Sequence, residues 1–292
     1  MYNKFKGIIL IILSALFFAA MNGFIKEVKG IPLGEKVFYR NIMLFVVSIV
    51  IIIKNKSSFL GHKGSRIQLF LRGAFGTLGI LAGFYALQHM ILPNETMFAD
   101  LNIFFIIIFS FIFLKERVNA IQVTAIVIAF IGVLFIIKPS AKYHMSLIPV
   151  IVAIISAALS GGAYTIIRGI RSKEKPETIV FFLALVSLIF TVPYMIIHYV
   201  PLTTHQLILL MLSGVCIAGA EVCATKAYTY APGKEISVFG YTEMIFSMII
   251  SFVFFGALPK PMQYIGYILI ILGGLIVFLY DRKIYRTNKL QN

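Results

Sequence analysis

Ten apolar runs constrain the fold of this chain more than any other feature. A helix needs about 20 residues to cross a bilayer, and ten such helices with their connections use nearly all of the 292 residues. Charged residues, Pro or Gly bound the runs, and the predicted spans are 7–26, 33–53, 67–90, 94–114, 119–137, 147–169, 177–199, 205–229, 235–256 and 262–280. The sequence therefore predicts an all-α polytopic membrane protein with no room for a soluble catalytic domain.

The composition excludes several other classes of protein. Hydrophobic residues make up 60% of the chain and charged residues only 13%, whereas about 25% of a soluble domain is charged. Cys216 and Cys223 lie about 10 Å apart along one helix face, which is too far for a disulfide. No metal-ligand spacing and no phosphate-binding loop is visible. We expect no cofactor, no metal and no nucleic-acid partner.

The basic residues predict the orientation of the chain. With ten spans and a cytoplasmic N-terminus, nineteen of the 26 Lys and Arg residues fall on the cytoplasmic side and six on the other, while Arg40 remains within a span. Positive residues gather on cytoplasmic loops, so most of the net charge of +15 needs no nucleic-acid explanation. We expect a multi-pass protein of the plasma membrane with both termini in the cytoplasm.

A weak internal repeat divides the chain. At an offset of 141 or 142 residues the matching positions are Ser14 with Ser156, Ala15 with Ala157, Lys26 with Arg168, Gly73 with Gly214, Ala86 with Ala227, Phe98 with Phe239, Gln122 with Gln263 and Gly132 with Gly273. The predicted repeats are 1–142 and 143–292, within one membrane domain. Each has five spans, and because five is odd the second enters the membrane from the opposite face. Two inverted five-helix repeats are typical of secondary transporters.

Several short motifs carry a family resemblance over nearly the whole chain. They are Phe38-Tyr39-Arg40-Asn41, Leu71-Arg72-Gly73, Phe84-Tyr85-Ala86-Leu87, Lys226-Ala227-Tyr228 and Tyr241-Thr242-Glu243. The sequence resembles the EamA-type ten-helix members of the drug/metabolite transporter superfamily. The resemblance implies a carrier of organic metabolites. Small multidrug members of that superfamily use a glutamate in the first helix, where this chain has Asn22 and no acid.

Two opposite charges lie at similar depth in the spans. Arg40 in the second span and Asp100 in the fourth are each about 10 Å from the same membrane face, at 1.5 Å per residue. They can form a buried ion pair, which offsets two desolvation costs. Alternatively, Arg40 presents its planar guanidinium to a carboxylate or phosphate of a substrate, with Asp100 holding or replacing it. Arg40 can also extend outward to water.

Two further carboxyl groups lie closer to the middle of the membrane. Glu221 in the eighth span has Lys226 five residues later as a possible partner, whereas Glu243 in the ninth span has no basic neighbour in sequence. Ionisable groups within spans normally face a cavity or a partner. Removal from water favours the protonated form of a carboxyl group, so Glu243, Glu221 and Asp100 are candidates for proton coupling.

Neutral polar side chains complete the candidate site. Asn22, Tyr85, Asn102, Tyr164 and Tyr241 are candidates for the lining of a substrate cavity, although each can equally form a hydrogen bond between helices. The repeat aligns Asn22 with Tyr164 and Asn102 with Glu243. This correspondence places both pairs near the axis that relates the repeats.

The sequence thus favours a secondary active transporter, not an enzyme, for a small polar organic metabolite. Arg40 indicates a carboxylate-bearing or zwitterionic substrate, such as an organic acid or an amino-acid-like compound, moved by alternating access with proton coupling or by exchange. The alternatives are an exporter of drugs or other cations with the same fold, and a membrane-embedded enzyme that modifies lipids. The expected partners are the substrate and the lipid bilayer, and the chain is a monomer or a homodimer.

Overall fold

The apolar runs form the helices of the computed structural model, which describes residues 4–137, 146–170, 173–230 and 237–291. Within these ranges, ten helical segments are long and apolar enough to cross a membrane, which confirms the predicted all-helical fold. The elements are α1 (Lys4–Glu27), α2 (Leu33–Lys54), the short 3₁₀ helix η1 (Lys63–Ser65), α3 (Arg66–His89), α4 (Leu92–Asp100), α5 (Asn102–Leu114), α6 (Ala120–Ile137), α7 (Leu147–Ile170), α8 (Pro176–Ile197), α9 (Thr204–Tyr230), η2 (Ser237–Tyr241), α11 (Thr242–Phe255) and α12 (Pro261–Gln291).

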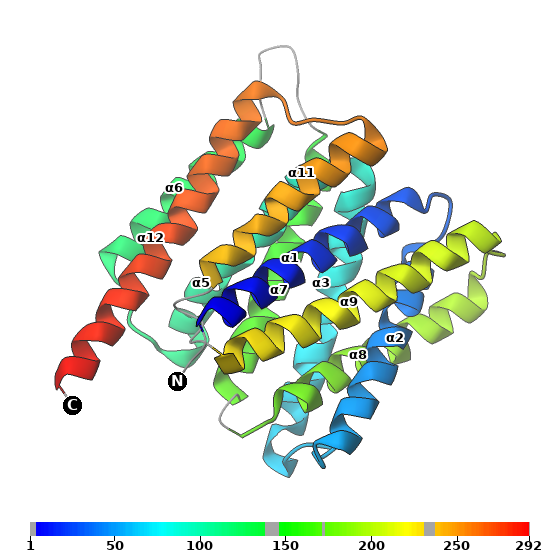
Figure 1. The fold of residues 1–292 in the computed structure, drawn as a ribbon, viewed down its shortest axis with the longest axis horizontal. Coiled ribbons are helices and arrows are strands. Elements are labelled where there is room, and N and C mark those ends of the chain that lie inside the picture. Colours follow the sequence, from blue (N-terminus) through cyan, green and yellow to red (C-terminus); the bar gives the residue numbers. More distant parts are fainter. Residues whose placement is uncertain (1–3, 138–145, 171–172, 231–236, 292) are drawn as a thin grey trace.

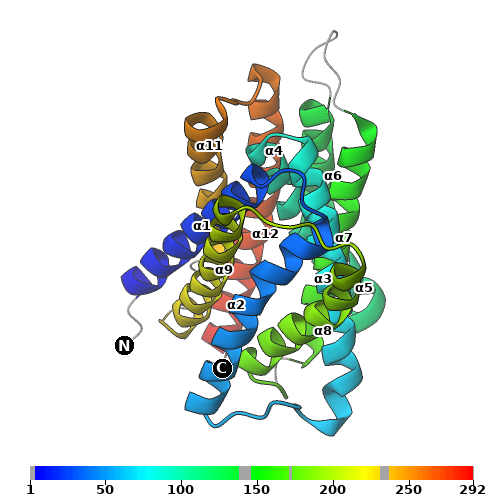
Figure 2. The same ribbon diagram turned by 90° about the vertical axis from the view of Figure 1, so that its right-hand side faces the viewer.

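Both ends of the chain lie at the same end of the bundle (Figure 1). We call this the terminal end; α1, α3 and α7 connect it with the opposite end, where α1 and α3 finish (Figure 2). An even number of spans requires this arrangement. The predicted division between residues 142 and 143 falls in 138–145, outside the described residues.

The helix packing has the symmetry of two repeats. In the repeat, α1 corresponds to α7 and α3 corresponds to α9. Accordingly, α1 packs along α9 and α7 packs along α3, and both contacts are extensive. The same correspondence relates α1–α11 to α7–α5 and α2–α9 to α8–α3, while the α2–α8 and α6–α12 contacts map onto themselves. The two halves of the chain therefore pack against each other rather than side by side as separate domains.

One hydrogen bond occurs twice in this arrangement. Ser14 Oγ on α1 donates to the carbonyl oxygen of Ala220 on α9 at 2.9 Å, and Ser156 Oγ on α7 donates to the carbonyl oxygen of Gly79 on α3 at 2.8 Å. Ser14 and Ser156 are equivalent in the sequence repeat, and Gly79 lies 141 residues before Ala220. The repeated sequence thus produces a repeated contact between the halves.

Small residues allow α6 and α12 to approach closely. A Cβ atom on Gly132 would lie 2.7 Å from the carbonyl oxygen of Gly266, and one on Gly266 would lie 2.5 Å from the carbonyl oxygen of Gly132. Neither distance is compatible with any residue larger than glycine. Backbone contact through small residues is a common way for helices to associate in lipid, where apolar side chains gain little by leaving the solvent.

The fourth span of each repeat is interrupted, near the middle of Leu92–Leu114 and near the start of Val238–Phe255. Leu101 separates α4 from α5 with φ −61° and ψ −15°, and Tyr241 separates η2 from α11 with φ −61° and ψ −10°. Both breaks are tight turns of 3₁₀ type. Each leaves the N-terminus of a half-helix, α5 or α11, inside the bundle rather than at a membrane surface.

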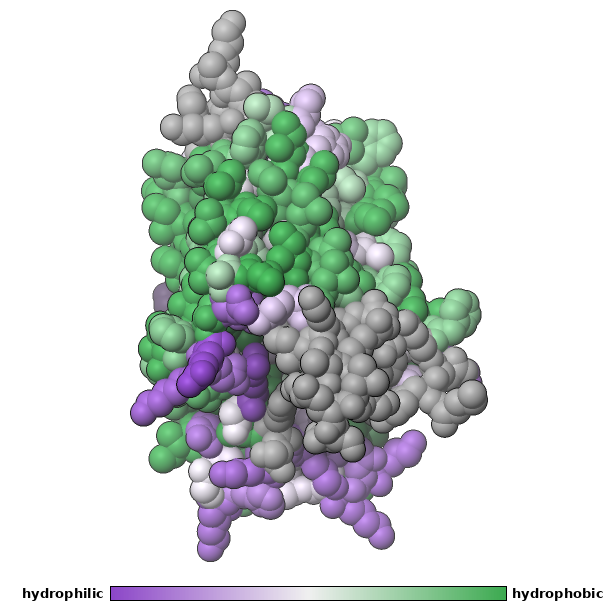
Figure 3. Space-filling model, turned by 90° about the vertical axis from the view of Figure 1, so that its left-hand side faces the viewer, coloured by the Kyte–Doolittle hydropathy of each residue, from purple (hydrophilic) through white to green (hydrophobic). Residues whose placement is uncertain are grey.

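The outer surface is suited to lipid. The face formed by α6 and α12 carries a broad apolar belt, with hydrophilic side chains gathered below it at the terminal end (Figure 3). The belt includes exposed Ile131, Leu134, Ile265, Ile268 and Leu272. At the terminal end, Glu174 accepts hydrogen bonds from Ser65 Oγ at 2.6 Å and from the backbone N–H of His62 at 2.8 Å, which fastens the α2–α3 connection to the start of α8.

Candidate functional site

A cavity of about 550 Å³ lies between the two repeats. Its wall comes from α1, α3, α4, α5, α7, α8, α9, η2 and α11, so both repeats contribute. The residues from α3 and α9, and all but Phe18 of those from α1, belong to the halves of those helices nearest the terminal end. Glu174 in the α7–α8 connection and Pro176 at the start of α8 lie on the wall as well. The cavity therefore extends from the middle of the bundle towards the terminal end.

The polar wall residues come from many elements. They are Ser14, Arg72, Asp100, Asn102, Tyr164, Glu174, Glu221, Thr225, Tyr241 and Glu243. Four of them flank the two helix breaks: Asp100 and Asn102 lie on either side of Leu101, and Tyr241 and Glu243 lie at the start of α11. The N-terminal end of a helix that begins within a span carries a positive partial charge.

One group of wall residues surrounds Arg72. Only 7% of Arg72 is exposed, and its Nε has no hydrogen-bond partner within the described part of the chain. Arg72 interacts electrostatically with Tyr164 on α7 and Glu221 on α9. We call Arg72, Tyr164 and Glu221 the Arg72 group. The guanidinium of Arg72 is the feature of the cavity best suited to bind a planar anionic group.

A second group contains two carboxyl side chains. Asp100, Tyr241 and Glu243, the Asp100 group, come from α4, η2 and α11. Asp100 acts electrostatically on both Tyr241 and Glu243. Asp100 Oδ2 and the Tyr241 hydroxyl are buried without a hydrogen-bond partner among the residues that the structure describes. This group can hold a cation or protons, because it concentrates acidic groups that lack internal donors.

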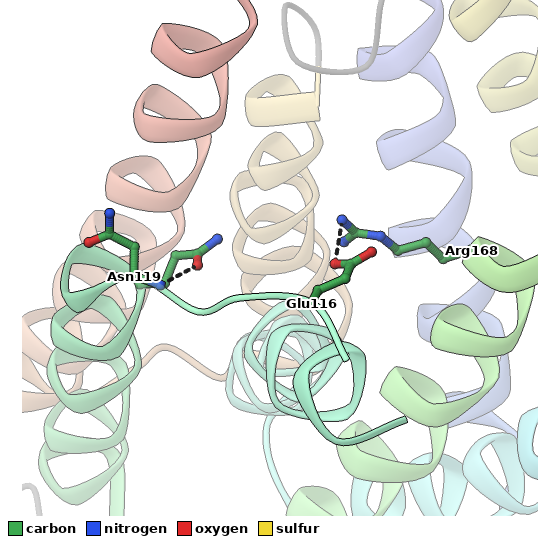
Figure 4. Close-up of polar contacts among 4 residues, drawn as sticks. Glu116, Asn119 and Arg168 are labelled. Atoms are coloured by element: carbon green, nitrogen blue, oxygen red, sulfur yellow. Dashed lines mark hydrogen bonds and ion pairs between the residues drawn. The ribbon is translucent and has the colours of Figure 1, made fainter. Parts of the chain in front are cut away.

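An ion pair lies beside the cavity at the terminal end. Arg168 Nη2 and Glu116 Oε2 are 2.8 Å apart and join the end of α7 to the α5–α6 connection (Figure 4). In the same connection, the backbone N–H of Asn119 donates to Gln122 Oε1 at 3.1 Å. Arg168 and Glu116 are both substantially exposed, and an exposed pair contributes little to stability.

One family model matches each of the two repeats separately. A model described as the EamA-like transporter family matches residues 5–138 and again 147–279. The chain belongs to the EamA-like transporter family. Each match covers five of the ten candidate spans, as two repeats require. The family confirms the expectation of a transporter rather than an enzyme.

Relatives of this EamA-family chain align over almost its full length. It is 27% identical over 286 residues to the pseudopaline exporter CntI of Pseudomonas aeruginosa, with 97% of each chain covered. It is 22% identical over 308 residues to a riboflavin transporter of Vibrio cholerae, covering 99% of this chain and 98% of the relative. A solved crystal structure matches with a TM-score of 0.65 at 16% identity, over 95% of this chain and 98% of the other, and this likeness supports the fold alone.

Six of the nine site residues expected from the sequence line the cavity of this EamA-family protein. They are Asp100, Asn102, Tyr164, Glu221, Tyr241 and Glu243. The aligned pair Asn102 and Glu243 follows the two helix breaks, one in each repeat. The break at Leu101 carries no Gly or Pro in the sequence, whereas Gly240 directly precedes the break at Tyr241.

Arg40 does not lie on the cavity wall. It is 5% exposed and donates from Nη1 to Asn41 Oδ1 at 2.6 Å, and its Nε contacts Met21 Sδ at 3.1 Å. The guanidinium also stacks on the Phe84 ring at 5.9 Å. Within the described residues no ion pair joins Arg40 to Asp100; Arg40 interacts electrostatically with Glu221 instead.

Asn22 and Tyr85 also lie away from the cavity wall. Asn22 is buried on α1, with 9% of its surface exposed. Tyr85 lies near the opposite end of α3, where its ring packs on His89 with 4.3 Å between the ring centroids. Both are polar residues within predicted spans, and position within a span does not specify the direction in which a side chain points.

Two functional candidates were not identified from the sequence. Arg72 was assigned to the basic loops of the cytoplasmic side, although six residues separate it from the start of α3. The motif Leu71-Arg72-Gly73 was the available signal. Glu95 lies within the fourth predicted span and is buried, and its spacing of five residues from Asp100 on one helix was the available signal.

Proposed function

We propose that this protein is a secondary active transporter that moves a small zwitterionic or carboxylate-bearing organic metabolite by alternating access, coupled to protons. The observation that carries the proposal is the composition of the cavity, in which the Arg72 group and the Asp100 group occupy one space of about 550 Å³. This volume is in the range of small-molecule sites. The relatives named above transport organic molecules, which supports the same class of cargo.

The Arg72 group would bind the carboxylate of the cargo. A guanidinium donates two parallel hydrogen bonds to a carboxylate, and Arg72 Nε is buried without a hydrogen-bond partner within the described residues. Glu221 restrains Arg72 in the empty cavity, because the two side chains attract each other. Arg40 acts from outside the cavity, through its interaction with Glu221.

The Asp100 group would bind the ammonium of a zwitterionic cargo or protons in its place. Asp100 and Glu243 repel each other when both are charged, and like charges that share a site favour binding of a proton or a cation. Asn102, Tyr164 and Tyr241 add hydrogen-bonding groups at the wall. If protons and the ammonium group of the cargo bind the Asp100 group in turn, the movement of protons is coupled to the movement of the cargo.

The same proposal includes the orientation in the membrane. We place the protein in the plasma membrane with both termini in the cytoplasm. The terminal end then faces the cytoplasm, and the cavity described here is the inward-facing one. The positive-inside distribution of Lys and Arg supports this orientation. Exchange of the conformations of the two repeats would open the opposite end.

A second candidate is an exporter of cationic compounds. Four carboxyl side chains, Asp100, Glu174, Glu221 and Glu243, lie on the cavity wall and favour positive cargo. Arg72 disfavours a purely cationic molecule in the same space. The two candidates differ in what Arg72 does: it anchors the cargo in the first and repels it in the second.

Counterflow in proteoliposomes tests both candidates. Vesicles loaded with unlabelled compound are diluted into labelled amino acids, organic acids, nucleobases or a cationic dye. We expect counterflow of a carboxylate-bearing compound, abolished in Arg72→Gln and partly retained in Arg72→Lys, with Arg66→Gln as the matched control because Arg66 is exposed on the same helix. Counterflow of the dye alone, unimpaired by Arg72→Gln, would overturn the proposal in favour of the second candidate.

A further inference from the structure

The short helix α4 separates the cavity from the opposite end of the molecule. It runs from Leu92 to Asp100, and all its residues from Leu92 to Phe98 are buried. Helices α1, α3, α7, α11 and α12 pack around it, and Figure 2 shows it near the end of the bundle away from the termini. Its last residue, Asp100, lies on the cavity wall. Any proton that moves between the cavity and the opposite end has to pass this helix or its neighbours.

Glu95 lies inside this closed part of the bundle. It is 8% exposed, is not on the cavity wall, and its Oε2 has no hydrogen-bond partner within the described residues. Its other carboxyl oxygen would be 3.6 Å from a Cβ atom on Gly83. The hydroxyl of Ser156 beside Gly83 donates to the backbone of Gly79 instead. The carboxyl group is therefore buried without a donor to stabilise a negative charge on Oε2.

The charged groups around Glu95 do not neutralise it. Those that act on it electrostatically are Lys26 on α1 and Asp100 on α4, and Glu95 in turn acts on Glu243 on α11. The ammonium of Lys26 donates to the carbonyl oxygens of Leu87 at 2.8 Å and Met90 at 2.6 Å. The neighbouring residues on α3 and α7 are Gly83 and Ser156, and on α12 Tyr267 donates to Asn94.

One positive charge thus accompanies three buried carboxyl groups. Glu95, Asp100 and Glu243 lie within mutual electrostatic range, and five residues of helix separate Glu95 from Asp100 by about 7.5 Å along the axis. A buried carboxylate without donors costs several kcal/mol, and the one nearby ammonium can balance only one of three such charges. Glu95 lies in the closed part of the bundle, and Asp100 and Glu243 lie on the cavity wall.

We propose that Glu95 is a proton-binding group and that Glu95 and Asp100 form the proton route between the cavity and the opposite end. This inference rests on the proposed proton-coupled transport and adds the path that its protons follow. Asp100 exchanges protons with the cavity. Glu95 exchanges them with the opposite end when the repeats change conformation, so a proton crosses without an open channel.

Infrared difference spectroscopy tests proton binding without any cargo. A pH step is applied to the reconstituted wild type and to Glu95→Gln, and the carbonyl stretch of protonated carboxyl groups is followed. We expect Glu95→Gln to lack part of the signal that disappears on alkalinisation, while Glu27→Gln, an exposed acid near the end of α1, keeps all of it. An identical signal in Glu95→Gln and wild type would overturn the proposal.

Transport separates this inference from the proposed function. The compound with the strongest counterflow is used, and uptake driven by a pH gradient is compared with counterflow. We expect Glu95→Gln to lose gradient-driven uptake and keep counterflow, and Glu95→Asp to recover part of the former. Full gradient-driven uptake in Glu95→Gln would overturn the route, whereas a wild type with counterflow but no response to the gradient would overturn proton coupling itself. If Glu95→Gln does not fold, a shifted carboxyl signal in Glu95→Asp supports proton binding and an unshifted one contradicts it.

Discussion

Ser14 on α1 donates a hydrogen bond to the carbonyl oxygen of Ala220 on α9, and this contact has a counterpart between Ser156 and Gly79. Both bonds join one repeat to the other; Ser14 also lies on the cavity wall, whereas Ser156 does not. A contact that occurs once for each repeat gives a quantitative test of the symmetry between the repeats.

We expect Ser14→Ala and Ser156→Ala to lower the free energy of unfolding by similar amounts, about 0.6 kcal/mol each, the mean for such bonds in membranes. Unfolding in detergent micelles measures both. Thr124→Ala is the control, because the Thr124 hydroxyl is exposed and bonds within its own helix. A large loss for one serine and none for the other would contradict equivalent packing.

The contact of α6 with α12 depends on two glycines. We expect Gly132→Ala and Gly266→Ala each to destabilise the protein by about 1–3 kcal/mol, because the added methyl group meets the backbone of the partner helix and the helices have to separate. Gly64→Ala is the matched control, since no atom lies within 4 Å of the Cβ position at Gly64. Thermal unfolding followed by circular dichroism gives the ranking, and equal stability of all three variants would refute the close approach.

We expect the ion pair at the terminal end to contribute little to the stability of the protein. Arg168 and Glu116 are about 40% exposed, so a double-mutant cycle of Arg168→Gln and Glu116→Gln should give a coupling energy below about 1 kcal/mol. Raising the salt concentration should reduce it further. A coupling of several kcal/mol that salt does not change would mean that the pair is shielded from water.

Asp100 should distinguish zwitterions from simple acids. If its carboxylate contacts the ammonium of the cargo, Asp100→Asn weakens competition by amino acids for counterflow and leaves competition by organic acids of similar size unchanged. Half-inhibitory concentrations of the two classes measure this, with Glu27→Gln as the control for loss of an acidic residue outside the cavity. Equal weakening of both classes would assign Asp100 to the integrity of the site rather than to ammonium binding.

The sequence predicted the spans and the repeat well, because apolar length and the offset between matching residues are properties of the chain itself. The ten candidate spans and the two family matches agree with it. Charged residues within spans were also visible, which is why Asp100, Glu221 and Glu243 were selected before the structure placed them on one wall.

Which way a side chain points was harder to predict. In a soluble helix the apolar stripe indicates the buried face, but lipid and protein interior are both apolar, so helices such as α1 and α9 have no such stripe. Depth alone therefore selected Arg40, which points to Met21 and Phe84, and passed over Arg72, which faces the cavity. The break at Leu101 has no Gly or Pro signal, whereas Gly240 directly precedes the one at Tyr241.

The central claim is that one cavity binds the cargo at Arg72 and protons at Glu243. The most direct test compares counterflow with pH-gradient-driven uptake of one compound in the wild type, Arg72→Gln and Glu243→Gln. We expect Arg72→Gln to lose both activities, because the cargo is not bound, and Glu243→Gln to lose only the gradient-driven one. Gradient-driven uptake that persists in Glu243→Gln, or counterflow that persists in Arg72→Gln, would contradict the claim.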